Sequence, residues 1–167
     1  MRYPPGQKDR THERILDSAT RRFKRDGFEA SGIKPLMRDA GLTNGGFYAH
    51  FESKEAALAE ALSESLRQTR EMIARQLESG DGIAAIQRIA DGYASVAHRD
   101  SSETGCPVPA LSSEIARLGD GPRNAYTEGM NEICNLVARH QPGEVHADAR
   151  QWAIAVTAML VGSVLMA

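Results

Sequence analysis

The sequence has little cysteine and no hydrophobic run long enough to cross a membrane. Its cysteines are Cys106 and Cys134, which form no Cys-x-x-Cys pair. Such isolated cysteines favour two reduced, mostly buried thiols in a cytoplasmic protein. The longest uncharged apolar run covers residues 152–167 and falls short of the roughly 20 residues that a membrane span needs. We therefore expect a buried helix there and no membrane partner. The polar first residues contain two prolines, so we expect no signal peptide.

Motifs of the common enzyme classes are also missing. The five histidines form no His-Glu-x-x-His pair, and neither a Gly-x-Ser-x-Gly elbow nor a phosphate-binding glycine loop occurs. His140, His146 and Asp148 straddle a Pro-Gly turn in a spacing that fits no standard metal site. The sequence therefore predicts no catalysis, no cofactor and no metal.

Strand signals are absent as well, because the sequence has no sustained period-2 alternation and no hairpin dipeptide between β-branched runs. Apolar residues recur at helical spacing instead, which predicts an all-α fold. Ser31 and Ser53 are the predicted N-caps of the second and fourth helices. After a flexible lead over residues 1–7, we expect helices over residues 8–26, 32–40, 43–50, 53–78, 83–98, 109–118, 122–140 and from about 146 onward.

Charge is distributed unevenly along the chain. Residues 1–54 hold 11 Lys and Arg against 7 Asp and Glu, a net charge of +4. Residues 55–167 hold 9 basic and 15 acidic residues, a net charge of −6. Such a division indicates that the first part alone contacts phosphates. We therefore expect a DNA-binding head over residues 8–54, which continues into a helix to about residue 78, and a helical body over residues 79–167.

Residues 39–51 have the pattern of a helix-turn-helix, in which the second helix enters the major groove. Gly41 suits the tight turn because glycine tolerates positive φ. A small shared core can form from Leu36, Ala40, Leu42, Phe47 and Phe51.

Because Phe47 and Phe51 are four residues apart, they lie on one face of the second helix, and Asn44, Gly45 and Tyr48 face outward. An asparagine can read adenine through two hydrogen bonds. The Gly45-Gly46 pair is unfavourable in a helix but lets the backbone approach DNA closely. The segment thus predicts binding to double-stranded DNA.

The same stretch resembles the TetR family of bacterial transcriptional regulators, over roughly residues 8–60. The resemblance rests on Arg14-Ile15-Leu16-Asp17-Ser18-Ala19, Arg25-Asp26-Gly27-Phe28, Ala40-Gly41-Leu42-Thr43 and the run from Gly46 to Ala56. It implies contacts to bases or nearby phosphates from Lys34, Asn44, Gly45 and Tyr48, and phosphate contacts from Thr43, His50 and Lys54. The family often has an aromatic residue or histidine where Ala49 stands, which puts that contact in doubt.

The resemblance also implies an all-helical body that forms a homodimer through its last helices. Trp152, Val156, Leu160 and Val164 form one stripe of the last predicted helix, with Met159 and Ser163 beside it. A helix that is apolar nearly all round must be covered on more than one side, so a second subunit is the expected partner. The family normally continues through another helix beyond the position of Ala167, so we expect the last helix of the family to be lacking in this chain.

The family resemblance further implies a small-molecule effector that releases a repressor from its operator. Candidate pocket residues are Tyr93, Cys106, Leu111, Tyr126, Met130 and Cys134. Each of them can equally be an ordinary core residue. In an alternative interpretation, Cys106 is a redox or electrophile sensor, because a thiol at a helix N-terminus has a lowered pKa. A helical interaction module without DNA affinity is a further alternative, which the basic first 54 residues argue against.

Overall fold

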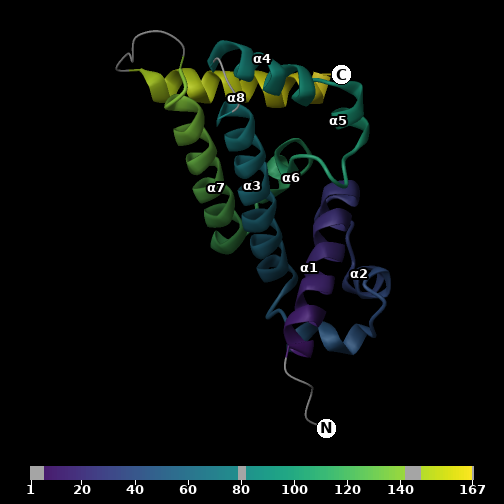
Figure 1. Ribbon diagram of the computed structural model, residues 1–167. Coiled ribbons are helices and arrows are strands. Elements are labelled where there is room, and N and C mark those ends of the chain that lie inside the picture. The colour runs from purple at the N-terminus through teal and green to yellow at the C-terminus, as the bar shows by residue number, and fades with distance from the viewer. Residues whose placement is uncertain (1–5, 79–81, 142–147, 167) are drawn as a thin grey trace.

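All secondary structure in the described part of the chain is helical, as the sequence predicts (Figure 1). The structure is a computed structural model that describes residues 6–78, 82–141 and 148–166. Its elements are α1 (Gln7–Asp26), α2 (Ile33–Asp39), the 3-10 helix η1 (Asn44–Ala49), α3 (Lys54–Glu78), α4 (Gly82–Tyr93), α5 (Val96–Asp100), α6 (Pro107–Ile115), α7 (Asp120–Ala138) and α8 (Ala149–Met166). Most of the predicted lead, the predicted break at 79–81, most of the turn after Gln141, and His146 lie outside the described residues.

The long helix α3 joins two parts of the molecule. α1, α2, η1 and the start of α3 form a small head at one end, and α4 to α8 surround the other end of α3 (Figure 1). α3 and α7 run side by side, while α4 and α8 lie across their upper ends.

The head is held together by one apolar face of α1. Ile15, Ala19 and Phe23 recur every four residues and are fully buried, because this spacing places them on one side of the helix. They pack in one cluster that also contains the predicted core of the helix-turn-helix. In that core Leu36, Ala40, Phe47 and Phe51 are buried, and Leu42 is partly buried.

The same cluster continues into the body. Leu111 and Ile115 of α6 and Ala125 of α7 are buried against the head residues. A second cluster further along α3 contains Leu66 and Ile133, among others. The head therefore shares an apolar core with α6 and α7, and a movement of either part changes contacts in the other.

The N-cap predictions had different outcomes. Ser53 caps α3, since its Oγ accepts a hydrogen bond from the Ala56 amide at 3.0 Å. The prediction for Ser31 is wrong: the residue before α2 is Gly32, with no side-chain cap. The buried Ser31 hydroxyl instead donates to the Gly27 carbonyl at 2.6 Å and so closes the turn that follows α1.

Three predicted helices differ from those observed. The helix expected over 83–98 is interrupted, because α4 ends at Tyr93 and Ser95 starts a new helix by accepting the His98 amide. The helix expected over 109–118 begins at Pro107, which occupies the first turn and needs no amide partner there. The recognition helix expected over 43–50 is the 3-10 helix η1, whose two glycines weaken an α-helical conformation.

The close packing of α3 and α7 generates a stability prediction at Gly129. A Cβ atom added there would lie 2.7 Å from Leu66 Cβ, whereas one added at Gly121 would lie 3.8 Å from Ala59 Cβ. We expect Gly129→Ala to lower the free energy of unfolding by about 1–2 kcal/mol, because overpacking outweighs the higher helix propensity of alanine. Gly121→Ala, the matched control, should leave it unchanged or slightly raised. Denaturant titration measures both, and equal effects of the two substitutions would contradict the packing argument.

Candidate functional site

The turn between α2 and η1 has the geometry that the helix-turn-helix pattern predicts. Gly41 adopts a φ of +66°, a conformation that favours glycine. The Leu42 amide donates to the Met37 carbonyl at 2.8 Å and closes the turn. Arg14 of α1 donates to the Ala40 carbonyl at 2.7 Å, so that α1 holds the end of α2. Sequence reasoning missed this role of Arg14, which joins groups 26 residues apart.

The outward face of η1 is polar and accessible. Thr43, Asn44 and Gly45 are exposed, and Tyr48 is 67% exposed although its ring contacts buried Phe47 edge to face. Lys34 of α2 is exposed as well. Arg38, one helical turn further along α2, is also exposed. Lys34 and Arg38 thus share one face of α2, and sequence reasoning did not single out Arg38.

His50 and Lys54 lie deeper than the other predicted contact residues. His50 is half-buried, its Nδ1 has no hydrogen-bond partner among the described residues, and its ring centroid lies 6.0 Å from that of His12. Burial, with His12 and Lys8 nearby, lowers the pKa of His50. The Lys54 ammonium donates to the carbonyls of Phe28 and Ser31 and lies 4.0 Å from the Phe28 ring centroid. Two of its three hydrogens therefore serve the fold of the head, which leaves one for any phosphate.

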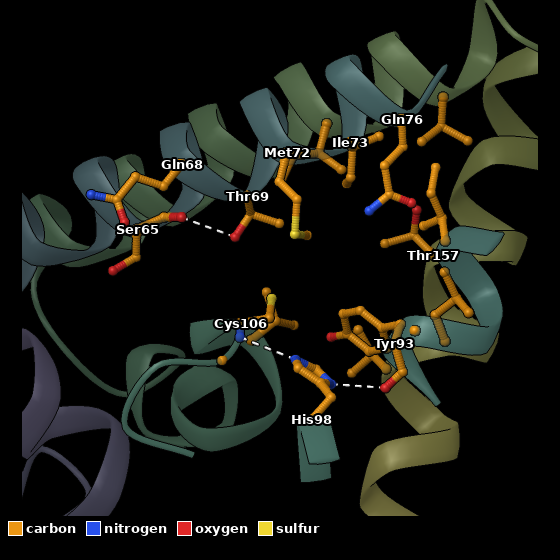
Figure 2. Close-up of a pocket in the computed structure, with 18 of the residues that line it drawn as sticks. Ser65, Gln68, Thr69, Met72, Ile73, Gln76, Tyr93, His98, Cys106 and Thr157 are labelled. Atoms are coloured by element: carbon orange, nitrogen blue, oxygen red, sulfur yellow. Dashed lines mark hydrogen bonds between the residues drawn. The ribbon is translucent and has the colours of Figure 1, made fainter. Parts of the chain in front are cut away.

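The body contains a cavity of about 430 Å³ (Figure 2). It is lined mainly by α3, α4, α7, α8 and the segment before α6, with single residues from α1, α5 and α6. This volume lies within the range of small-molecule sites. Of the predicted pocket residues, Tyr93, Cys106 and Met130 line it. Leu111 belongs to the core shared with the head, Tyr126 packs between the two core clusters, and Cys134 is buried outside the lining.

Most of the cavity wall was not predicted. α3 contributes Gln68, Thr69, Met72 and Gln76, which Figure 2 shows on one side of the cavity, facing Tyr93, His98 and Cys106 on the other. The α3 residues lie between the buried positions of the helix stripe and could have been found from helix periodicity. His98 could not, because the helix break that places it is a tertiary effect.

His98 fixes the segment that carries Cys106. Its ring contacts the Tyr93 carbonyl through Nδ1 at 2.8 Å and the Cys106 amide through Nε2 at 3.3 Å. Since a carbonyl only accepts and an amide only donates, Nδ1 carries the hydrogen and Nε2 accepts, which is the neutral imidazole. His98 thereby ties the end of α4 to the start of α6.

Three side chains join this segment and α6 to the head. The Glu114 carboxylate of α6 accepts the Phe28 amide at 3.2 Å and the Glu29 amide at 2.8 Å. Arg25, near the end of α1, donates to Glu103 at 2.9 Å. Lys24 donates to the Gly105 carbonyl at 3.1 Å and also lines the cavity. A residue of the head thus forms part of the wall of a cavity in the body.

Two family models match the chain. One, described as bacterial regulatory proteins of the tetR family, matches residues 15–61, which cover the helix-turn-helix. The other, described as the C-terminal domain of LmrA/YxaF-like transcriptional regulators, matches residues 82–167, just over half of the chain. The chain belongs to the TetR family of transcriptional regulators. It is therefore a DNA-binding regulator, and the family is one of regulators rather than enzymes.

Similar proteins agree with this assignment. The regulator LmrA of Bacillus subtilis is 27% identical over 160 residues, which cover 93% of this chain and 85% of LmrA. YxaF of the same organism is 26% identical, with 93% of this chain and 84% of YxaF covered. The repressor NemR of Escherichia coli is 26% identical over 135 residues, which cover 77% of this chain and 66% of NemR. The reduced form of E. coli NemR has a similar fold, with a TM-score of 0.77 at 24% identity, covering 94% of this chain and 86% of NemR.

In this TetR-family chain the last helix is less buried than predicted. Only Ala153 is buried among the described residues of α8. Val156 and Leu160 line the cavity, Trp152 and Ser163 are half-buried, and Met159 is 66% exposed. The predicted buried helix is therefore wrong for a single chain: one face of α8 closes the cavity and the other is an uncovered apolar face that includes Ile154 and Leu165.

By length and composition alone, α8 could also cross a membrane, since it has 18 residues with a mean hydropathy of 1.4. In the structure, 6% of this helix is buried. That test is weak evidence, because core helices of soluble proteins pass it too. The cavity-lining face of α8 gives it a place in the protein fold.

Cys106 does not have the properties that a sensing thiol would need. It precedes α6 as predicted, but burial raises the pKa of its thiol, and the Val108 amide, Tyr93 and Lys24 offset this only in part. The predicted lowering of the pKa is wrong because burial outweighs the helix N-terminus. The redox interpretation is therefore not favoured.

The raised pKa makes alkylation a direct test. We expect iodoacetamide at pH 7.5 to modify Cys106 in the folded protein at least about tenfold more slowly than in the chain unfolded in guanidinium, because fewer thiols are ionised. Mass mapping separates Cys106 from Cys134. Faster modification in the folded protein would restore the sensor interpretation.

Proposed function

We propose that this TetR-family regulator is a repressor that leaves its operator when a small molecule occupies the cavity. The observation that carries the proposal is the shared wall: Lys24 belongs to α1 of the head and lines the cavity of the body. A ligand that changes the cavity therefore meets a helix of the DNA-binding unit itself. The relation to a protein named as a repressor, NemR, supports the direction of regulation.

The DNA-binding surface that we propose consists of the outward faces of η1 and α2. Asn44 and Tyr48 would reach base edges, Gly45 would allow close approach of the backbone, and Thr43 and Lys34 would bind phosphates. Arg38 is added because it shares the exposed face of Lys34. His50 and Lys54 remain predicted phosphate contacts, with Lys54 limited by its two bonds to carbonyls.

We also propose that the protein is a homodimer and that it acts in the cytoplasm, where it has access to DNA. The uncovered apolar face of α8 supports a second copy as its partner, because an exposed patch of this kind is typical of an interface. Two heads related by a two-fold axis would read half-sites about 34–36 Å apart, or a multiple of that distance.

Repression requires that binding of a ligand and binding of DNA oppose each other. In the proposed mechanism the head position that fits the operator is the one seen with Glu114 bound to the Phe28 and Glu29 amides. A ligand that favours another arrangement of the segment before α6 shifts the population away from this position and lowers operator affinity.

The DNA surface is tested by substitutions in η1. We expect Asn44→Ala and Tyr48→Ala each to weaken binding to an operator selected from random DNA by about 1–3 kcal/mol, without loss of helix content, because both side chains are exposed. Fluorescence anisotropy of labelled duplex measures the affinity. Arg67→Ala in α3, whose side chain pairs with Glu64 and Glu71, is the control that should leave it unchanged.

Phosphate contacts give a separate signature in salt. We expect Lys34→Ala to lower the affinity for all duplexes by a similar factor, and to reduce the slope of log affinity against log salt concentration by about 1. Failure of the unsubstituted protein to bind any selected duplex at low salt would overturn the proposed function.

A further inference from the structure

The cavity contains a buried ammonium group with little compensation. Lys24 is 8% exposed, and its Nζ has one hydrogen-bond acceptor among the described residues, the Gly105 carbonyl at 3.1 Å. Within the same part of the chain no carboxylate forms an ion pair with it. Burial lowers the pKa of Lys24, while Cys106 and Asp17 favour its charged form and Arg21 opposes it.

Lys54 shows what a satisfied lysine looks like in this head. Its ammonium has two carbonyl acceptors and the face of an aromatic ring. Lys24 has one acceptor, so two of its three hydrogens are without a protein partner in the described residues. A buried cation in this state is unfavourable, unless another group supplies the missing acceptors.

The other described residues that line the cavity are uncharged. Among the described residues that line it, Lys24 alone carries a formal charge, since His98 is held as neutral imidazole and the remainder are apolar or uncharged polar residues. The Tyr93 hydroxyl is a second buried group. It forms no hydrogen bond of ordinary geometry with the described residues, and it interacts with the neighbouring Cys106 thiol, which is only a weak hydrogen-bonding group. Both Lys24 and Tyr93 interact electrostatically with Cys106, and Figure 2 shows the Tyr93 ring reaching toward that residue.

We propose that the ligand of this cavity is a small organic acid, with a largely apolar body and one anionic oxygen group that accepts hydrogen bonds from the Lys24 ammonium and the Tyr93 hydroxyl. The inference rests on the proposed function, because it assigns a ligand class to the same cavity. The apolar body would contact Met72, Ile73, Val156 and Leu160, which line the remaining wall. The anionic group would supply the acceptors that the described residues do not provide.

This position of the anionic group also explains how a ligand in the cavity would affect the DNA-binding head. Lys24 now binds Gly105, in the segment that His98 holds. An anionic group beside Lys24 competes with that carbonyl for the ammonium, and so weakens one of the contacts between head and body. Lys24 would then both recognise the anionic group of the ligand and weaken the contact between the head and the body.

A matched pair of fluorescent probes tests the ligand class. 8-Anilinonaphthalene-1-sulfonate and N-phenyl-1-naphthylamine share one aromatic skeleton and differ in the sulfonate. We expect the sulfonate to bind the unsubstituted protein more tightly than the neutral probe. Lys24→Met should lower the affinity for the sulfonate at least about tenfold and change the affinity for the neutral probe less than about twofold.

Arg21→Met is the control, because it removes the same charge from the same helix at an exposed position outside the lining. It should leave both affinities unchanged. Circular dichroism and thermal unfolding check that each variant folds. We expect Lys24→Met to be as stable as the unsubstituted protein or more so, since it removes a buried charge.

The outcomes separate this inference from the proposed function. Three outcomes would overturn the organic-acid ligand while leaving a ligand-binding cavity. They are an equal loss of affinity for both probes in Lys24→Met, unchanged affinity for the sulfonate in that variant, and a preference of the unsubstituted protein for the neutral probe. Binding of neither probe to the unsubstituted protein would overturn both.

Discussion

The position of the head depends on the Glu114 carboxylate, which accepts the amides of Phe28 and Glu29 from the turn after α1. Gly27 allows this approach, because it adopts a φ of +81° and a Cβ atom there would lie 2.6 Å from Glu114 Oε1. The buried contacts of Leu111 and Ile115 with the head lie on the same helix, α6. Together with α3, which runs from the head into the body, helix α6 therefore positions the head relative to the body.

The cavity lies beside this connection. The segment between α5 and α6 contributes Gly105 and Cys106 to its wall and contacts α1 through Lys24 and Arg25. His98 holds that segment from the other side. In the proposed regulation, a change in the cavity wall would therefore reach the head through a few hydrogen bonds rather than across the whole body.

Local signals were sufficient to predict the helix-turn-helix and the all-α class. Gly41, Phe47 and Phe51 act through spacing along the chain, and the structure places them as the spacing indicates. The roles of Glu114 and Lys24 were not predictable, because their partners lie more than 80 residues away along the chain. Cys106 shows the same limit: its place before a helix was visible in the sequence, but the burial that raises its pKa was not.

In the proposed regulation, filling the cavity alters the contact between Glu114 and the amides of Phe28 and Glu29. This can be measured by amide hydrogen exchange at Phe28 and Glu29, with and without saturating 8-anilinonaphthalene-1-sulfonate. We expect faster exchange of these two amides when the cavity is filled, because the Glu114 contact loosens, and unchanged exchange in the middle of α7. Unchanged protection of Phe28 and Glu29 with the cavity filled would contradict it.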